Sequence, residues 1–391
     1  MQIAILRELS PGESRVALVP EAVRGLVSKG LEVAVEAGCG AAAGAGDEDY
    51  RQAGASVVSD RQRLLATADL LPVVNSPAAA DLRQLKSGAV IIGFLRPLDA
   101  AASLQPAIER GATLFAMELV PRITRAQAMD ALSSMATVAG YKAVLLAADR
   151  LPRMFPLLMT AAGTIPPAHV LVLGAGVAGL QAIATARRLG AMVNAYDVRA
   201  AAGEQVRSLG AKFLEVDLGG IETEDKGGYA KELTEEALAR GRELIAATAR
   251  TSDVVITTAQ VPGKRAPRML SRAAVESMRP GSVVVDLAAP AGGNCELTRM
   301  GEEVVHNGVT VMGPANLPAT VPVHASQLYS RNVSNFLQLL VRNYTPANAT
   351  AAFARDPVSA LNLDWNDEII RDSCVAHQGE LVNKRVSLQA A

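Results

Sequence analysis

Short apolar runs alternate with helical patterns along most of this 391-residue chain, and this alternation most constrains its fold. A repeated strand–helix rhythm predicts a largely parallel sheet with helices on both faces, because parallel strands need crossover connections. Two such series are present, and a helical region rich in Ala, Met and Leu separates them over 125–150. The strands are expected at 3–6, 31–36, 70–74, 90–94 and 113–117, then at 169–173, 192–197, 212–216, 253–257, 282–287 and 309–313.

The two series predict two α/β domains of the doubly wound, Rossmann-like class with mainly parallel sheets. A last helix is expected from about 326 to 343, after a segment punctuated by three prolines, and it can return to the first domain. We therefore predict a discontinuous N-terminal domain of residues 1–135 and 325–391. A nucleotide-binding domain of residues 136–324 would be inserted in it, with long helices joining the two.

Composition excludes several classes of function. Thirty-eight basic and thirty-nine acidic residues leave no basic excess for nucleic acid or for anionic lipid. Three cysteines without CxxC spacing and four histidines without an HxxxH pair predict no disulfide framework and no metal site. The stretch 154–186 lacks Lys, Arg, Asp and Glu, but its prolines and glycines favour a buried helix end, a turn and a buried strand. We expect no membrane span, no export signal and a cytoplasmic location.

The strongest local motif is GAGVAG at Gly174 to Gly179. It directly follows the apolar run 170–173 and opens a helix, and the next strand ends in Asp197. The glycines allow a tight turn and a close backbone approach, so a pyrophosphate can lie at the helix N-terminus. Asp197 would accept hydrogen bonds from an adenosine ribose and repel a 2′-phosphate, which predicts NAD(H) over NADP(H). Two cautions remain: a plain glycine turn with a capping Asp nearby, and Arg199, since an arginine there can receive a 2′-phosphate.

A second polar cluster lies before and within the long helical region. Gln127, Asp130 and Ser133 are spaced by three residues and could share one helical face, with Arg122 upstream. Arg122 and Asp130 could pair, which leaves Gln127 and Ser133 to hold an amide such as a nicotinamide carboxamide. A solvated helix surface explains the same four residues equally well. Likewise, the Gly-rich stretch 219–229 predicts either a mobile loop tipped by Tyr229 or a plain surface loop.

Long, specific strings distributed over almost the whole chain point to one enzyme family. They are Arg7-Glu8, Glu13 to Ala17 (ESRVA), Gly174 to Gly179, Asp197-Val198-Arg199, Gly227 to Lys231 (GGYAK), Thr257 to Ala259 (TTA), Pro262-Gly263-Lys264, Val285 to Ala288 (VDLA), Gly292 to Glu296 (GGNCE), Asp367-Glu368-Ile369 and His377 to Glu380 (HQGE). These strings resemble the alanine dehydrogenase and nicotinamide nucleotide transhydrogenase family. The candidate cofactor-binding residues are then Gly174, Gly176, Val177, Gly179, Asp197, Val198, Arg199, Gly228, Tyr229 and Gln260.

Proton chemistry favours one branch of this family. An alanine dehydrogenase moves protons as well as a hydride, and that branch has a Lys, a His and an Asp where this chain has Asn75, Arg96 and Pro290. Arg15, which binds the substrate carboxylate in that branch, is retained, but an arginine cannot act as acid or base at neutral pH. Hydride transfer between two nicotinamide rings needs none of these groups. Their loss therefore favours the transhydrogenase branch.

Segments 117–122 and 125–134 also resemble the NAD(H)-binding component of the proton-translocating transhydrogenase. The resemblance implies that Arg122, Gln127, Asp130 and Ser133 surround the nicotinamide, and that Tyr229 lies on a loop that closes over the nucleotide. It implies that this chain binds NAD(H) and passes a hydride from NADH to NADP+ on a partner subunit, in a split form of the enzyme.

The implied partners are an NADP(H)-binding subunit, a membrane-spanning subunit that carries the protons, and a second copy of this chain in a homodimer. The chain itself would be peripheral on the cytoplasmic face of the inner membrane. Two alternatives stay open: a soluble alanine-dehydrogenase-like enzyme anchored by Arg15, and a non-catalytic NAD-binding module.

Overall fold

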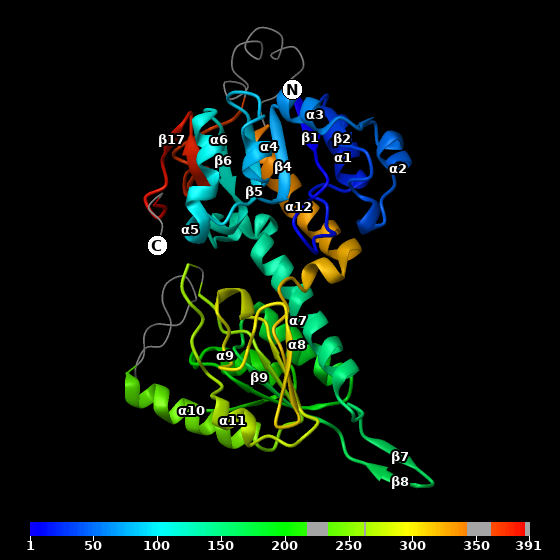
Figure 1. Cartoon of the computed structure of the whole chain (residues 1–391), viewed down its shortest axis with the longest axis vertical. Coiled ribbons are helices and arrows are strands. Elements are labelled where there is room, and N and C mark those ends of the chain that lie inside the picture. The colour runs from blue at the N-terminus through cyan, green and yellow to red at the C-terminus, as the bar shows by residue number, and fades with distance from the viewer. Residues whose placement is uncertain (217–233, 262, 342–360, 388–391) are drawn as a thin grey trace. The chain divides into compact units, whose positions relative to one another are not determined.

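The computed structural model describes residues 1–216, 234–261, 263–341 and 361–387 (Figure 1). The chain forms two compact α/β units, which we call unit 1 (Met1–Met135 with Ala319–Ala391) and unit 2 (Ala136–Pro318). Residues 319–324, which the sequence assigned to the inserted domain, pack with unit 1. The predicted fold class, two Rossmann-like units with mainly parallel sheets, is confirmed.

Unit 1 is built on a sheet that, within the described ranges, has eight strands in the order β17-β16-β6-β5-β4-β1-β2-β3. Strands β1 to β6 are parallel, whereas β16 and β17 each run antiparallel to their inner neighbour. Their bounds are β1 (Gln2–Ile5), β2 (Glu32–Glu36), β3 (Ser56–Val58), β4 (Leu70–Asn75), β5 (Val90–Phe94), β6 (Thr113–Ala116), β16 (Cys374–His377) and β17 (Glu380–Leu381). All five predicted strands are present, and β3, β16 and β17 are additions.

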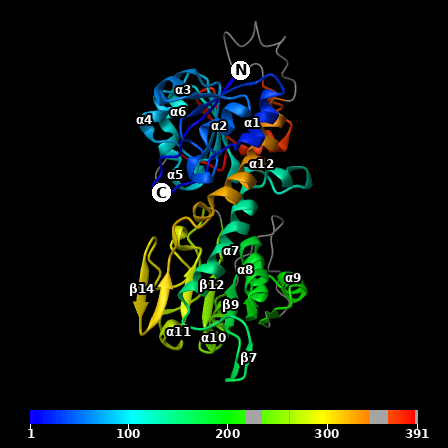
Figure 2. The same ribbon diagram turned by 90° about the vertical axis from the view of Figure 1, so that its right-hand side faces the viewer.

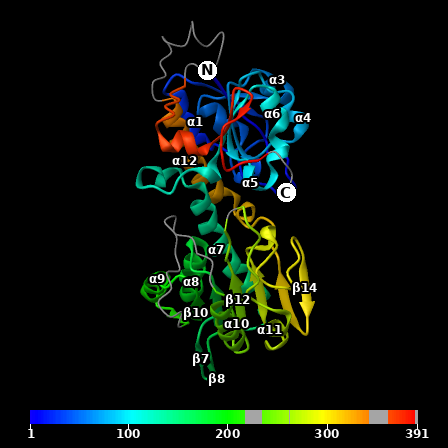
Figure 3. The ribbon, with the colours of Figure 1, turned by 90° about the vertical axis from the view of Figure 1, so that its left-hand side faces the viewer.

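Helices cover both faces of this sheet. Leu114 of β6 faces the core under α3, α4 and α6, whereas its neighbour Phe115 packs against Phe336 of α12 with ring centroids 5.2 Å apart. Figure 3 shows these two groups of helices on opposite sides of the sheet. The helices are α1 (Pro20–Val27), α2 (Asp47–Gln52), α3 (Arg61–Thr67), α4 (Ala79–Leu82), α5 (Pro97–Ala100), α6 (Gln105–Glu109), α12 (Pro322–Leu340) and α14 (Glu368–Ser373), with 3-10 segments η1 (Ala41–Ala43), η2 (Ala101–Leu104), η3 (Met117–Leu119), η4 (Thr124–Met129) and η6 (Pro318–Thr320). Helix α12 begins earlier than predicted because Pro322 is tolerated at a first helical position.

Unit 2 has a second sheet, with seven strands among the described residues in the order β11-β10-β9-β12-β13-β15-β14. The six predicted strands are present and parallel, and the additional β14 is an antiparallel edge strand (Figure 2). Their bounds are β9 (His169–Leu173), β10 (Met192–Tyr196), β11 (Lys212–Phe213), β12 (Val254–Thr257), β13 (Val283–Asp286), β14 (Glu303–His306) and β15 (Val309–Met312).

Alternate residues of the unit 2 strands enter two cores, which explains why these strands are apolar throughout. Val170 and Val172 of β9 pack under α7, α8 and α9, whereas Leu171 and Leu173 pack under α10 and α11. The helices are α7 (Ala131–Arg150), α8 (Val177–Arg188), α9 (Ala202–Ser208), α10 (Glu235–Ala249) and α11 (Arg272–Glu276), with the 3-10 segment η5 (Ala289–Ala291).

Helix α7 is the one helix of the described residues that is long and apolar enough to span a membrane, with a mean hydropathy of 1.4. Its residues Ala143, Val144 and Ala147 are buried in the core of unit 2. At Gly140, an added Cβ would lie 2.1 Å from the carbonyl oxygen of Ala178 in α8. Close packing of α7 against α8 therefore uses the small and apolar residues of this helix.

The segment after α7 differs from the prediction. Strands β7 (Leu158–Thr160) and β8 (Gly163–Ile165) form an antiparallel hairpin that pairs with no other described strand. The sequence predicts a buried helix end and a turn here, but the Met159 side chain is 72% exposed and that of Leu157 is 54% exposed. Gly163, at a φ of 131°, permits the tight reversal. Figure 1 shows the hairpin projecting from unit 2.

Candidate functional site

The glycine-rich turn of unit 2 joins β9 to α8, and its three glycines have three different roles. Gly174 adopts a φ of 94°, which turns the chain at the end of β9. An added Cβ at Gly179 would lie 1.8 Å from the carbonyl oxygen of Gly174, so glycine is required for the helix to pack this closely. The corresponding Cβ at Gly176 has no neighbour within 4 Å, which leaves open space at the start of α8. Turn, packing and open approach are what a pyrophosphate site requires.

Asp197 lies directly after β10 and connects this strand to the glycine-rich turn. Its Oδ2 accepts a hydrogen bond from the backbone N–H of Ala175 at 2.7 Å. The Arg199 guanidinium donates to both carboxylate oxygens, from Nε to Oδ1 and from Nη2 to Oδ2, each at 2.9 Å. A 2′-phosphate at this strand end would therefore meet the negative charge of Asp197 and the positive charge of Arg199 side by side.

The sheet order reverses between β9 and β12, and the loop after β12 is anchored at this point. Thr258 donates from Oγ1 to the Gly174 carbonyl oxygen at 3.0 Å. Asn294, fully buried, accepts from the backbone N–H of Ala259 at 3.0 Å and donates to its carbonyl oxygen at 2.8 Å. Next to this anchor, Gln260 is exposed. In doubly wound sheets, ligands bind at the carboxyl ends of the strands at such a reversal.

Thr258 and Asn294 were not among the predicted site residues. Two sequence signals were available. Thr258 is a polar residue directly after an apolar run, and Asn294 lies in the glycine-rich string GGNCE. Of the other predicted contacts, Val177 is 41% exposed in the first turn of α8 and Val198 is half-buried. Gly228 and Tyr229 lie outside the described residues.

Unit 1 carries the four polar residues predicted to surround a nicotinamide, but they do not share one helix. Segment η4 ends at Met129 and α7 begins at Ala131, so the predicted common helical face is wrong. Asp130 lies at the break, where its Oδ1 accepts from the Ser133 backbone N–H at 2.9 Å and its Oδ2 from Ser133 Oγ at 2.6 Å. An aspartate that caps a helix in this way ends the preceding turn. Arg122 and Gln127 are exposed and could bind an amide.

A buried ion pair occupies the loop after β1 in unit 1. Arg15 donates to Glu13 through Nε at 2.7 Å and Nη2 at 2.6 Å, and Asn75 at the end of β4 donates to the same carboxylate at 2.9 Å. Burial alone would raise the pKa of Glu13, but the hydrogen bonds and charge of Arg15, with the Asn75 amide, lower it to about 2. Glu13 is therefore ionised at neutral pH, and the Arg15 fork is engaged within the protein.

Two more carboxyl groups close the ends of β4 and β5. Glu8 accepts from the backbone N–H of Val74 at 2.5 Å, and Glu118 accepts from the N–H groups of Leu95 and Arg96. Burial raises the pKa of each carboxyl to about 7, which is in the range of a general acid or base. Both carboxyls are nevertheless bound to backbone amides, so a substrate would have to displace a hydrogen bond that holds a strand end.

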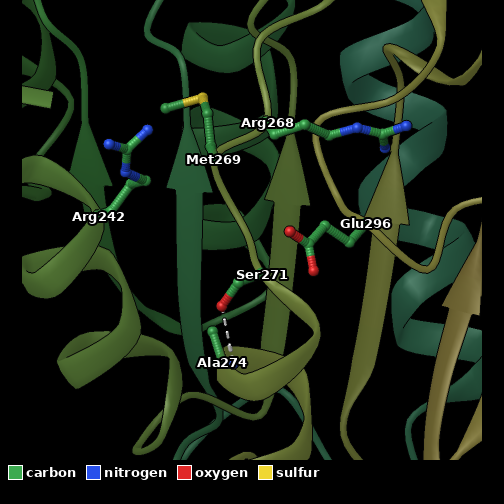
Figure 4. A pocket seen from close by; sticks show the side chains of 6 residues that line it. All are labelled: Arg242, Arg268, Met269, Ser271, Ala274 and Glu296. Atoms are coloured by element: carbon green, nitrogen blue, oxygen red, sulfur yellow. Dashed lines mark hydrogen bonds between the residues drawn. The ribbon is translucent and has the colours of Figure 1, made fainter. Parts of the chain in front are cut away.

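A cavity of about 300 Å³ lies between α10 and α11 in unit 2 (Figure 4). Its lining residues are Arg242, Arg268, Met269, Ser271, Ala274 and Glu296. Arg268 donates to the Cys295 carbonyl oxygen at 2.5 Å, and Glu296 accepts from the Arg272 backbone N–H at 2.7 Å, so both serve the local fold. None of the predicted site residues lines the cavity. The part of the chain that the structure describes holds no group of His, Cys, Asp and Glu fit for a metal.

Two family models match the chain over nearly its full length. The alanine dehydrogenase/PNT N-terminal domain matches residues 4–139, and the C-terminal domain of the same family matches residues 143–384. The chain belongs to the alanine dehydrogenase/PNT family. The family predicted from the sequence is thereby confirmed.

Within the alanine dehydrogenase/PNT family, the chain is more similar to transhydrogenase subunits than to an alanine dehydrogenase. It is 44% identical over 397 residues to the first part of NAD(P) transhydrogenase subunit alpha of Rhodospirillum rubrum, covering 100% of both chains. The solved transhydrogenase of Sinorhizobium meliloti has a TM-score of 0.86 and 42% identity, covering 98% of this chain and 100% of that one. Identity to the alanine dehydrogenase of Mycobacterium tuberculosis is 31% over 395 residues, covering 99% and 96%. The predicted transhydrogenase branch is confirmed by this resemblance.

The three positions at which the resemblance implies a Lys, a His and an Asp in the dehydrogenase branch hold Asn75, Arg96 and Pro290 in this chain. Asn75 ends β4 and is bound to Glu13. Arg96 follows β5 at a φ of 53°, with an exposed side chain, and Pro290 is exposed in η5. Asn75 and Arg96 of unit 1 and Pro290 of unit 2 thus lack the proton-transfer groups that the resemblance assigns to a dehydrogenase at these positions.

Proposed function

We propose that this chain is the NAD(H)-binding catalytic subunit of a proton-translocating transhydrogenase, and that it passes a hydride from NADH to NADP+ on a partner subunit. The observation that carries this proposal is Asn75, which stands where the dehydrogenase branch has a lysine and donates a hydrogen bond to Glu13. An amino acid substrate would lack the proton-transfer groups of that branch.

Binding of the dinucleotide is supported by unit 2. The backbone N–H groups at the start of α8 would hold the pyrophosphate, with the open space beside Gly176 as its approach. Asp197 would accept the ribose hydroxyls, and Val177, Val198, Gln260, Gly228 and Tyr229 would complete the contacts. When bound, the nicotinamide ring supplies or accepts the hydride.

Orientation of the nicotinamide is the role we propose for unit 1. Direct transfer requires the two ring C4 atoms within about 3 to 3.5 Å, so the ring has to be held where a partner can reach it. Arg122 and Gln127 are exposed, polar and able to hydrogen-bond a carboxamide. Asp130 and Ser133, hydrogen-bonded to each other, would line the same place.

Partner subunits are supported by the relatives, which are named as alpha subunits. We propose an NADP(H)-binding subunit and a membrane-spanning subunit with the proton path, which would hold this chain at the cytoplasmic face of the inner membrane.

The β7–β8 hairpin supports a homodimer of this chain, because isolated two-stranded hairpins are only marginally stable in water. A second copy would cover exposed Leu157, Met159 and Ile165. Sedimentation of a Met159→Asp variant as a dimer would contradict this use of the hairpin.

Purified chain is expected to show no alanine-dependent reduction of NAD+ and no pyruvate-dependent oxidation of NADH. The reason is the absence of acid–base side chains at positions 75, 96 and 290, which hold Asn75, Arg96 and Pro290. Absorbance at the wavelength of reduced nicotinamide measures both reactions, with an authentic alanine dehydrogenase as the positive control. Steady turnover of either substrate would establish the amino acid dehydrogenase alternative instead.

Asp197→Ala is expected to narrow the preference for NADH over NADPH by about tenfold or more, which corresponds to roughly 1.4 kcal/mol. The wild-type chain should bind NADH clearly more tightly, because the carboxylate favours ribose hydroxyls and repels a 2′-phosphate. Calorimetric titration with both nucleotides measures the ratio.

Asp253→Asn is a suitable control for this experiment. Asp253 is also buried and binds arginines, but it lies at the opposite, amino end of β12. Equal wild-type affinity for the two nucleotides, or an unchanged ratio in Asp197→Ala, would refute the assigned role of Asp197.

A further inference from the structure

A bidentate ion pair binds the surface segment η4 to the C-terminal portion of unit 1. Arg125 donates from Nη1 to Asp367 Oδ2 at 2.7 Å and from Nη2 to Asp367 Oδ1 at 2.5 Å. Asp367 also accepts from the Ile369 backbone N–H at 2.9 Å, which caps α14. The position of Arg125 is thus tied to the start of a helix more than two hundred residues away in sequence.

Two hydrogen bonds from α12 hold the other end of the same segment. The carbonyl oxygen of Ala128 accepts hydrogen bonds from two side-chain amides of α12, from Asn332 Nδ2 at 3.0 Å and from Asn335 Nδ2 at 3.2 Å. The two asparagines are three residues apart and therefore lie on the same face of the helix. Segment η4 packs against α12 along this face.

Gln127 lies between Arg125, which pairs with Asp367, and Ala128, whose carbonyl oxygen is bound by α12. Its neighbours Ala126 and Met129 are buried, at 1% and 9% exposure, whereas Gln127 itself is exposed. The backbone that carries Gln127 is thus held before and after it, while the side chain points to solvent.

The contacts that hold η4 combine a bidentate ion pair with hydrogen bonds from two asparagines. The Arg125 side chain is 54% exposed and that of Asp367 is 13% exposed, so solvent screens the pair only partly. Asn332 is only 6% exposed, yet its Oδ1 has no hydrogen-bond partner among the described residues, which costs folding free energy. The contacts do restrict where the η4 backbone can lie.

We propose that Arg125, Asp367, Asn332 and Asn335 are positioning residues that hold η4 so that Gln127 meets the nicotinamide in one orientation. The inference rests on the proposed function, in which Gln127 binds the carboxamide. None of the four positioning residues needs to touch the reacting ring, because they act through the backbone on either side of Gln127.

Asp367→Asn tests this proposal with little effect on the fold, since asparagine caps a helix as well as aspartate. In the nucleotide-free chain, amide hydrogen exchange over 124–130 should become faster. In the assembled enzyme, single-turnover hydride transfer should slow about tenfold, while the NADH dissociation constant changes less than twofold. Arg125→Met should give the same result, and the double variant should be no slower than either single variant.

Asp372→Asn is the matched control. Asp372 forms an exposed pair with Arg371 at 3.0 Å within the same helix, α14. This variant should leave exchange over 124–130 and the transfer rate unchanged. In a Gln127→Ala background, Asp367→Asn should not slow hydride transfer further if it acts through Gln127.

Wild-type exchange and transfer in both Asp367→Asn and Arg125→Met would overturn the positioning role alone. So would a further tenfold loss in the Gln127→Ala background. Failure of the proposed function has a different signature, namely no hydride transfer in the unmodified assembly, or wild-type transfer in Gln127→Ala alone.

Discussion

Replacing Arg122 or Gln127 with alanine is expected to slow hydride transfer in the assembled enzyme at least tenfold, which is about 1.4 kcal/mol of transition-state stabilisation. Both side chains are exposed polar groups, Gln127 within η4 and Arg122 shortly before it, and we assign them to the carboxamide. NADH binding should weaken much less, because in the proposed function the pyrophosphate and ribose contacts in unit 2 would supply most of its affinity. Single-turnover transfer to partner-bound NADP+, followed by stopped-flow absorbance, measures the rate.

Arg83→Ala is the control for these variants. Arg83 is also an exposed arginine of unit 1, but it follows α4, outside the polar cluster. It should transfer hydride at the wild-type rate. Wild-type rates in Arg122→Ala and Gln127→Ala as well would mean that the cluster is a solvated surface.

Gly176→Ala and Gly179→Ala are expected to fail in different ways. At Gly176, a methyl group has open space and a φ of −77°, so the fold should be unchanged. The methyl would occupy the approach of the pyrophosphate, and NADH affinity should fall at least tenfold, or roughly 1.4 kcal/mol. At Gly179, the methyl would lie 1.8 Å from the Gly174 carbonyl oxygen and force α8 from β9, which should destabilise unit 2 by about 1 to 3 kcal/mol. Calorimetric titration and thermal unfolding separate the two effects.

Gly25→Ala provides the reference for a tolerated substitution. Gly25 is in α1, where an added Cβ meets nothing within 4 Å. Alanine should stabilise this helix, by up to about 1 kcal/mol. Unchanged NADH affinity in Gly176→Ala would show that the pyrophosphate does not bind at this turn. A wild-type unfolding midpoint in Gly179→Ala would contradict the packing role of Gly179.

The inner parallel strands could be predicted because both of their faces are buried, which makes each a short apolar run. Edge strands such as β3 and β14 have only a few residues and partly exposed side chains, so they carry no such signal. The β7–β8 hairpin was missed because exposed apolar residues look like a buried run when contacts are unknown.

The candidate site was predicted unevenly for physical reasons. The glycine-rich turn is local, and its roles follow from conformation. The break at Asp130 was not predicted, because the spacing of three residues favoured one continuous helix over the capping role that an aspartate can also take. The Arg125–Asp367 pair and the bonds from Asn332 and Asn335 could not be predicted, because they join segments far apart in sequence.

The most direct test of the central claim follows a deuterium label. NADH deuterated at the transferable C4 position is mixed with the assembled enzyme and NADP+, without any amino or oxo acid, and the products are analysed by mass spectrometry. Direct transfer between two nicotinamide rings predicts that the NADPH formed carries the deuterium and that none is lost to water. NADPH without deuterium, or NADPH that forms only when alanine or pyruvate is added, would contradict the account.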